Sequence, residues 1–279
     1  MRKKYTGIIL ILVFTVLAGG CINQTPDENG QIDDMSSTPD INDNTKTDTI
    51  YQFSTINALL EGIYDGEVSF GELKENGDFG LGTFNNLDGE MIQLEGIFYQ
   101  VRADGKVYEV DDSQTSPFVA ITFFETDIQD TVTTQMDSEQ VEDSITQILP
   151  SRNLMYAVKI TGNFSYMKTR SVAAQEKPYP RLVNVTKDQS VFEFNNTRGT
   201  IIGYWMPEYA EGINVPGFHL HFITEDKNAG GHILEYTIDS GTIELDSTDE
   251  LYLDLPSNEN YLGMGSSSVT DGELEEVEN

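Results

Sequence analysis

The chain has 279 residues and carries 47 acidic against 16 basic side chains, a formal net charge of -31 at neutral pH. Residues 1–50 hold only seven of the acids and four of the bases, which leaves 40 acids against 12 bases, or -28, for the rest of the chain. So acidic a surface excludes nucleic acid as a partner, because phosphate binding needs clustered Lys and Arg. It also repels anionic ligands at long range, so an anionic substrate must be held by a local positive field.

Residues 1–21 have the pattern of a lipoprotein-type signal peptide. A basic start is followed by an apolar run from Ile8 to Leu17 and by small residues before Cys21. The run is too short for a membrane-spanning helix, which needs about twenty residues. Cys21 is the only cysteine, so we expect it to be lipidated rather than to serve redox chemistry. The alternative is an uncleaved N-terminal anchor. Either interpretation predicts an exported body outside the cytoplasmic membrane. The lipoprotein interpretation, which we prefer, predicts that the body is lipid-anchored at the outer face of that membrane and touches it only through this anchor.

Residues 22–50 are predicted to be a disordered acidic tether. They contain Asn, Asp, Thr, Ser, Gln, Pro and Gly with almost nothing apolar, so they cannot bury enough surface to offset the entropy of the chain. The acidic charges extend such a linker and hold the body away from the lipid.

Residues 51–279 are predicted to form the catalytic body, with an α+β fold of two packed β-rich lobes divided near residue 150. Helical spacing of apolar residues predicts helices over residues 51–64 and 138–149. Asp104-Gly105 predicts a hairpin within residues 95–110. Further strands are expected at residues 118–124, 154–161, 199–205 and 241–245. The expected architecture is therefore mixed or antiparallel sheet with a few helices.

All three histidines of the chain lie in one short segment, at His219, His221 and His232. A strand places His219 and His221 on one face, and the Asn228-Ala-Gly-Gly stretch can turn the chain back to bring His232 beside them. Three neutral imidazoles with an open position are typical of a catalytic zinc site. The alternatives are another single-metal site, such as iron, or ordinary half-buried strand histidines.

Several segments of the body are similar to the alpha-acetolactate decarboxylase family. They are residues 59–66 (Leu-Leu-Glu-Gly-Ile-Tyr-Asp-Gly), residues 77–90 ending in Leu-Asp-Gly-Glu, residues 162–172, and residues 214–221 (Asn-Val-Pro-Gly-Phe-His-Leu-His). The resemblance extends from about Tyr51 to Glu278. It implies decarboxylation of (2S)-2-acetolactate, a small anionic keto acid, to (R)-acetoin and CO2 through a metal-stabilised enediolate. It also implies one zinc ion per chain, held by the three histidines.

By the same resemblance, four more residues enter the site. Arg170 would pair with the substrate carboxylate or stabilise developing charge, Glu90 would deliver a proton to the enediolate, and Thr83 would orient substrate. Glu278 is chosen from the four glutamates of the tail by alignment of the ending. Without the resemblance, Arg170 would be interpreted as part of a surface ion pair. Glu90 would be only one of the 47 acidic residues, and the glutamates of the tail would be expected to be exposed to solvent.

Two other functions fit parts of this pattern. A cupin has His-x-His followed by Glu, as at Glu225, but it needs a later histidine and none follows His232. A lipid-tethered protein that binds zinc or another ligand without catalysis is the second alternative. A homodimer is left open, because no pattern in the chain decides the oligomeric state.

Overall fold

The computed structural model describes residues 48–265, 269 and 272–278, and the statements below concern these residues. Cys21, the predicted signal peptide and nearly all of the predicted tether lie outside them. The last two residues of that tether belong to the fold, because Thr49 and Ile50 open strand β1 (Thr49–Phe53) and the side chain of Ile50 is fully buried. Within the described part of the chain, no helix is long and apolar enough to cross a membrane.

The first sheet is built mainly from the N-terminal part of the body. Its strand order is β15-β1-β8-β3-β4-β5-β6, and all neighbours are antiparallel except β1 and β15, which are parallel. Besides β1, its strands are β3 (Phe79–Thr83), β4 (Glu90–Leu94), β5 (Ile97–Val101), β6 (Val107–Glu109), β8 (Val119–Thr122) and β15 (Glu250–Asp254). The predicted hairpin at Asp104-Gly105 is confirmed, because it joins β5 to β6. A small separate sheet pairs β2 (Val68–Ser69) with β7 (Thr115–Ser116).

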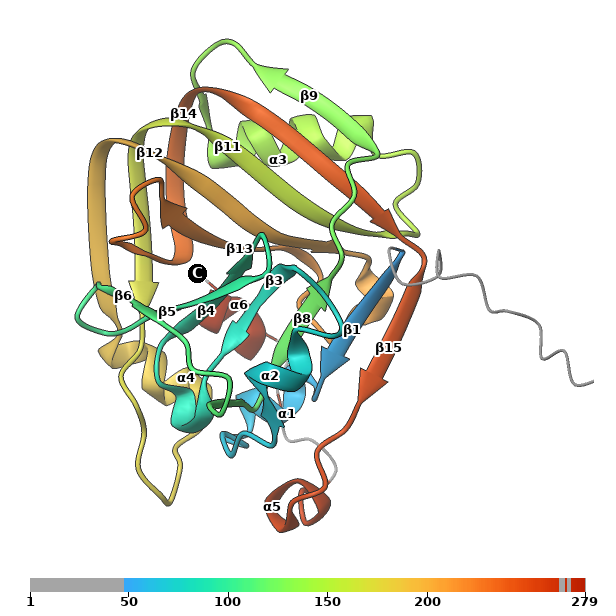
Figure 1. Ribbon diagram of the computed structural model, residues 1–279, viewed down its shortest axis with the longest axis vertical. Coiled ribbons are helices and arrows are strands. Elements are labelled where there is room, and N and C mark those ends of the chain that lie inside the picture. Colours follow the sequence, from blue (N-terminus) through green and yellow to red (C-terminus); the bar gives the residue numbers. More distant parts are fainter. Residues whose placement is uncertain (1–47, 266–268, 270–271, 279) are drawn as a thin grey trace, which may run out of the picture. The chain divides into compact units, whose positions relative to one another are not determined.

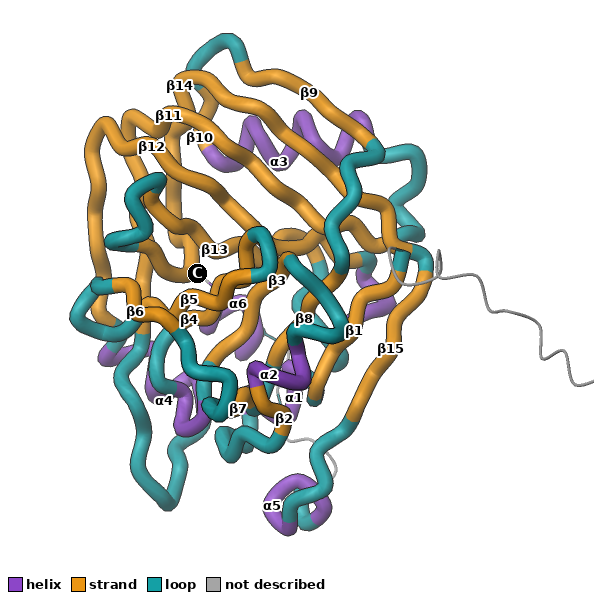
Figure 2. The backbone as a smooth tube through the Cα atoms, viewed as in Figure 1, coloured by secondary structure: helices purple, strands orange, loops and turns teal. Residues whose placement is uncertain are grey.

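The second sheet contains three very long strands that curve together (Figures 1 and 2). Its order is β10-β14-β11-β12-β13, with β9 paired to β14 and a further pairing between β13 and β14. The strands are β9 (Ile128–Val132), β10 (Met136–Asp137), β11 (Met155–Ser171), β12 (Ser190–Met206), β13 (Gly217–Thr224) and β14 (Gly230–Thr248). Because the first residues of β14 pair with both β11 and β13, the sheet closes on itself at that end.

Helices are short, apart from α3 (Ser138–Ile148). Asp137 caps α3 through a capping box with Gln140, and Val141 and Ile145 are its buried side chains, so the helix predicted at residues 138–149 is confirmed. The helix predicted at residues 51–64 is wrong in its first part, because residues up to Phe53 pair with β8 and β15 as strand β1. The remaining helices are α1 (Ile56–Leu60), α2 (Phe70–Leu73), α4 (Leu182–Val185), α5 (Glu259–Leu262) and α6 (Glu273–Glu278), with 3-10 turns η2 (Asn85–Leu87), η3 (Thr186–Asp188) and η4 (Glu208–Ala210).

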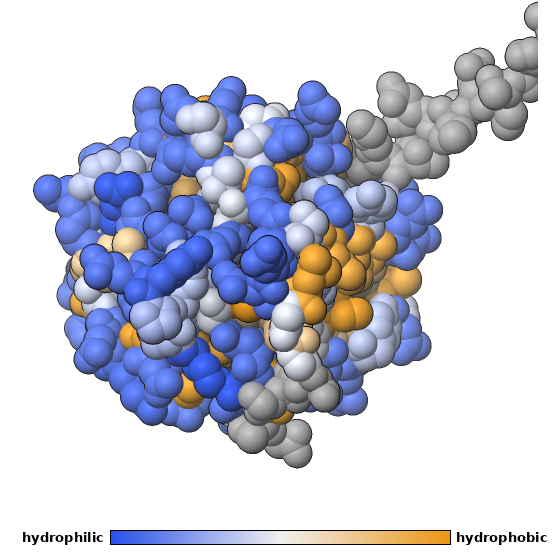
Figure 3. All heavy atoms as spheres, turned by 90° about the horizontal axis from the view of Figure 1, so that it is seen from below, coloured by the Kyte–Doolittle hydropathy of each residue, from blue (hydrophilic) through white to orange (hydrophobic). Residues whose placement is uncertain are grey.

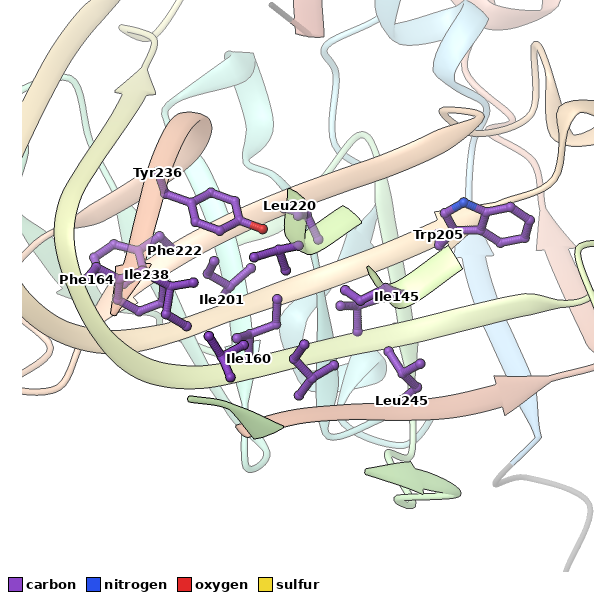
Figure 4. Close-up of a cluster of buried hydrophobic side chains, with 14 of the residues drawn as sticks. Ile145, Ile160, Phe164, Ile201, Trp205, Leu220, Phe222, Tyr236, Ile238 and Leu245 are labelled. Atoms are coloured by element: carbon purple, nitrogen blue, oxygen red, sulfur yellow. The ribbon is translucent and has the colours of Figure 1, made fainter. Parts of the chain in front are cut away.

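Two apolar clusters explain how the sheets hold together. One lies inside the second sheet, where Phe164, Phe222 and Tyr236 pack with aliphatic side chains (Figure 4). The other joins the sheets, since Leu81 and Ile92 of the first sheet pack with Ile202 of the second.

The predicted α+β, β-rich fold is confirmed. The chain passes from the first sheet to the second between β8 and β9, while residue 150 lies between α3 and β11.

Candidate active site

The three histidines converge on one buried point, as their spacing predicts. His221 of β13 lies opposite His232 of β14 in the antiparallel register, and His219 is on the same face two residues earlier. Their ring centroids are 5.2 to 5.4 Å apart. One nitrogen from each ring lies within 4.8 Å of the other two. His219 is 7% exposed, His221 is 1% exposed and His232 is 3% exposed, so the group is enclosed by protein.

The hairpin that joins these strands differs in one detail from the prediction. The turn is closed by the amide of Thr224, which donates to the Ala229 carbonyl, and Lys227 supplies the positive φ of 57°. Gly231 stands after the turn, inside β14, at a φ of 135°. A Cβ atom there would lie 2.4 Å from the carbonyl oxygen of Arg170. Glycine is therefore needed for the close approach of β14 to β11, and the tip of the hairpin is made by other residues.

The histidine rings are neutral, so each ring carries one nitrogen lone pair. His232 Nε2 also lies 3.3 Å from the main-chain carbonyl of Glu278. Burial, and then the charge of Arg170, lowers the pKa of His219 to about 3, and burial holds the pKa values of His221 and His232 well below their ordinary value. The Nδ1 atom of His221 lies 2.9 Å from the Met91 carbonyl. Because a carbonyl only accepts, Nδ1 carries the hydrogen and Nε2 carries the lone pair. Among the described residues, His221 Nε2 has no hydrogen-bond partner. Neutral imidazole nitrogens of this kind are suitable ligands for a metal ion, and the Met91 carbonyl orients the ring of His221 from its other nitrogen.

Arg170 and Glu90 lie beside the histidines as a buried ion pair. Arg170 is opposite His232 in the β11–β14 register, so both side chains emerge on the same face. Its Nη1 atom is 3.2 Å from Glu90 Oε1, and the two side chains are 5% and 9% exposed. The other carboxylate oxygen of Glu90 is 3.6 Å from His221 Nε2. Burial raises the pKa of Glu90 to about 7 even though the Arg170 charge opposes the rise, so this carboxyl group can carry a proton near neutral pH.

The C-terminal helix α6 brings Glu278 to the same place. Glu278 Oε2 lies 3.8 Å from Nε2 of both His219 and His232. These contacts are not ion pairs, because the rings are neutral. Burial also raises the pKa of Glu278. Arg170 Nη2 donates to the Val277 carbonyl at 2.9 Å, which fixes the end of the helix. The other tail glutamates point elsewhere: Glu273 contacts Arg181, Glu276 faces Lys187, and Glu275 lines an outer pocket.

Thr83 lines the cavity with Glu90, its partner in the β3–β4 register. Its hydroxyl donates to the Gly89 carbonyl at 2.7 Å, so it braces the turn that precedes Glu90 and leaves an oxygen lone pair for an acceptor role. The cavity itself has a volume of only about 40 Å³. A larger pocket of about 550 Å³ adjoins it and shares His232 and Glu278 as lining residues.

Sequence reasoning missed the groups that act through the main chain. The carbonyls of Met91 and Val277 orient His221 and Arg170, and any residue type could supply them. Arg181, which contacts Glu273 at the start of α6, was also missed, because one arginine in a polar segment gives no local signal.

A buried group of three histidines that can hold a metal, faced by an arginine and two carboxyl groups, defines an enzyme site in an α+β fold with two large sheets. Comparison of the chain with known proteins supports this assignment as an enzyme. Residues 50–266 match the family model of alpha-acetolactate decarboxylase. The Methanosarcina mazei protein of that name is 44% identical over 263 residues, 93% of this chain and 91% of the relative, and the Bacillus licheniformis protein is 48% identical over 214 residues, 77% and 85% of the two chains.

A crystal structure of the Bacillus subtilis strain 168 enzyme matches with a TM-score of 0.81 at 42% identity, covering 82% of this chain and 99% of that one. The chain belongs to the alpha-acetolactate decarboxylase family. It is a carboxy-lyase, and its relatives support decarboxylation of acetolactate in the acetoin pathway. The family match argues against both the cupin and the non-catalytic alternatives.

Proposed function

We propose that the chain converts (2S)-2-acetolactate to (R)-acetoin and CO2 with one zinc ion bound by His219, His221 and His232. The observation that carries this proposal is the set of three neutral, buried imidazoles beside an arginine and two carboxyl groups. Zinc at these nitrogens would act as a Lewis acid where negative charge develops. Membership of the family supplies the substrate class.

Arg170 supplies the fixed positive charge that the substrate needs. The body carries -28 overall, so an anionic keto acid is attracted only by a local positive field. The Arg170 guanidinium is 5% exposed and held by Glu90 and the Val277 carbonyl. A guanidinium held in this way can pair with the substrate carboxylate and orient it at little further entropic cost.

Glu90 is proposed as the proton donor. Loss of CO2 from acetolactate leaves an enediolate, which must take a proton at the carbon that carried the carboxylate. Glu90 approaches the histidines from the first sheet, and Glu278 approaches them from α6. A carboxyl group fixed to one side of the intermediate delivers its proton to one face, and this gives a single enantiomer of acetoin. Glu278 is proposed to hold the intermediate from the α6 side.

Two variants separate metal binding from proton transfer. His219→Ala should lose bound metal and activity together, whereas Glu90→Gln should keep the metal and lower kcat by about 10²–10⁴-fold. Metal content by mass spectrometry, and acetoin by chiral gas chromatography, measure the two effects on the same preparations. Normal turnover and normal product chirality in Glu90→Gln would contradict its role as donor.

The location of the enzyme is a separate proposal. The signal-like segment before Cys21 supports an exported chain that is anchored by lipid at the outer face of the cytoplasmic membrane. Acetolactate that has left the cell would be the substrate there.

A further inference from the structure

Helix α6 (Glu273–Glu278) is held against the body at both of its ends. At the C-terminal end, Arg170 binds the Val277 carbonyl and the Val277 side chain is buried near Leu182. At the start, Glu273 Oε2 is 2.6 Å from Nη2 of Arg181. We infer that Arg181 is a positioning residue for the reaction, which acts through Glu273 and α6 to keep Glu278 beside the histidines. This inference rests on the proposed role of Glu278.

Arg181 stands where three helices meet. It occupies the N-cap position of α4, and its Nη2 atom also lies 3.4 Å from the Glu61 carboxylate at the end of α1. The side chains of Arg181 and Glu273 are 30% and 18% exposed. A partly buried arginine between two carboxylates holds its partners more firmly than an exposed surface pair does. The guanidinium therefore fixes α6 relative to α1 and α4.

The position of α6 matters because the helix lines two cavities. Val277 lines the small cavity of about 40 Å³ that contains the histidines, and Leu274 and Glu275 line the outer pocket of about 550 Å³. Glu278 lines both. A small displacement of α6 would move the Glu278 carboxyl group away from its 3.8 Å contacts with His219 and His232. Misplacement of a reacting group by about 1 Å can lower a rate by about 10²-fold.

A matched control is available on the same helix. Glu276 of α6 faces Lys187 at 4.0 Å, and these side chains are 57% and 60% exposed. Removing this pair deletes a charge contact of α6 that solvent already screens. Lys187→Ala should therefore leave turnover and the position of α6 unchanged.

The experiment uses the full chain loaded with zinc, as wild type, Arg181→Ala, Glu273→Ala, the double variant, Arg181→Lys and Lys187→Ala. We expect each single alanine variant at position 181 or 273 to lower kcat about 10-fold, with KM within about twofold and metal content unchanged. The double variant should be no slower than Arg181→Ala, because Arg181→Ala already removes the contact with Glu273 that Glu273→Ala breaks. Arg181→Lys should recover most of the loss. Hydrogen exchange of residues 272–278 should accelerate in the alanine variants at positions 181 and 273, and should stay at the wild-type rate in Lys187→Ala.

Several outcomes would overturn the inference. Losses that simply add in the double variant, normal kcat in Glu273→Ala, or unchanged hydrogen exchange in α6 would each show that Arg181 does not act through this helix. Equal loss of bound zinc and of kcat would assign Arg181 a purely structural role. A wild-type chain that binds zinc but makes no acetoin would instead reject the proposed function, which separates the two failures.

Discussion

At the scale of single residues, His221 shows how a side chain predicted from spacing is completed by its surroundings. The His-x-His pattern places His219 and His221 on one face of a strand, a property of the local chain. The hydrogen bond from His221 Nδ1 to the Met91 carbonyl then selects the tautomer that presents Nε2 to the site. Met91 is 130 positions away in the sequence, so no local pattern could have predicted this partner.

Asp246 gives a prediction about pH that does not involve the active site. It is 1% exposed, one carboxylate oxygen accepts the Glu125 amide at 3.2 Å, and the other has no partner within the described residues. Burial raises its pKa from 3.8 to about 7; the Glu125 amide opposes this, and the charges of Asp127, Asp48 and Glu125 add to it. The folded state therefore binds a proton that the unfolded state lacks between these values, so the free energy of unfolding falls as pH rises through that window.

Asp246→Asn removes this titration. We expect the variant to exceed wild type in free energy of unfolding by about 1–3 kcal/mol at pH 8.5, and by clearly less at pH 5.5, because the neutral carboxyl of wild type already avoids the desolvation cost there. Urea unfolding of both proteins at the two pH values measures the difference. A difference that is the same at both pH values would contradict the prediction.

At the scale of elements, the β13–β14 hairpin determines more of the site than its own histidines. The first residues of β14 pair with β13 on one side and with β11 on the other, so His221, His232 and Arg170 lie in one row across three strands. The sequence predicted the hairpin, whereas the pairing with β11 depends on closure of the sheet. The first part of the helix expected at residues 51–64 was wrong for a similar reason, since pairing of β1 with two other strands overrides the helical spacing of its residues, whereas α1 does form within that range.

Gly231→Ala tests the importance of this close approach. The new Cβ would lie 2.4 Å from the Arg170 carbonyl oxygen at a φ of 135°, so we expect the free energy of unfolding to fall by about 2 kcal/mol or more and zinc affinity to fall with it. The control is Gly217→Ala at the start of β13, where φ is 81° but no atom lies within 4 Å. It should cost about 1 kcal/mol and leave zinc affinity unchanged. Equal effects of the two variants on zinc binding would contradict a role for strand approach.

At the scale of the whole molecule, the site joins groups that arrive from both sheets and from the tail. Thr83 and Glu90 come from the first sheet, Arg170 and the histidines from the second, and Glu278 from α6. The surface is predominantly hydrophilic on the face shown in Figure 3, with a larger apolar patch and scattered smaller ones in orange. The acidic excess repels anionic ligands at long range, so the attraction of an anionic substrate is left to the site.

The proposed anchor also belongs to this scale, because it decides which solution the body meets. Cells that express the wild-type chain should incorporate labelled fatty acid into it, and protease added outside the cytoplasmic membrane should digest the body. Cys21→Ser should abolish the label and release the chain from the membrane fraction, because Cys21 is the only thiol in the sequence. Labelled Cys21→Ser, or a wild-type chain protected from external protease, would contradict the lipid-anchor proposal.

The sequence by itself determined the acidic charge of the body, the hairpin with three histidines on one face, and the long amphipathic helix α3. Each follows from the periodicity or composition of neighbouring residues. It also carried the family resemblance that singled out Glu90, Arg170, Thr83 and Glu278. Only the tertiary structure decided that Arg170 contacts Glu90 and the Val277 carbonyl, 80 and 107 positions away, and which tail glutamate reaches the histidines. These contacts depend on sheet closure and on the docking of α6, and the desolvation that shifts the pKa values of the site arises only when both are complete.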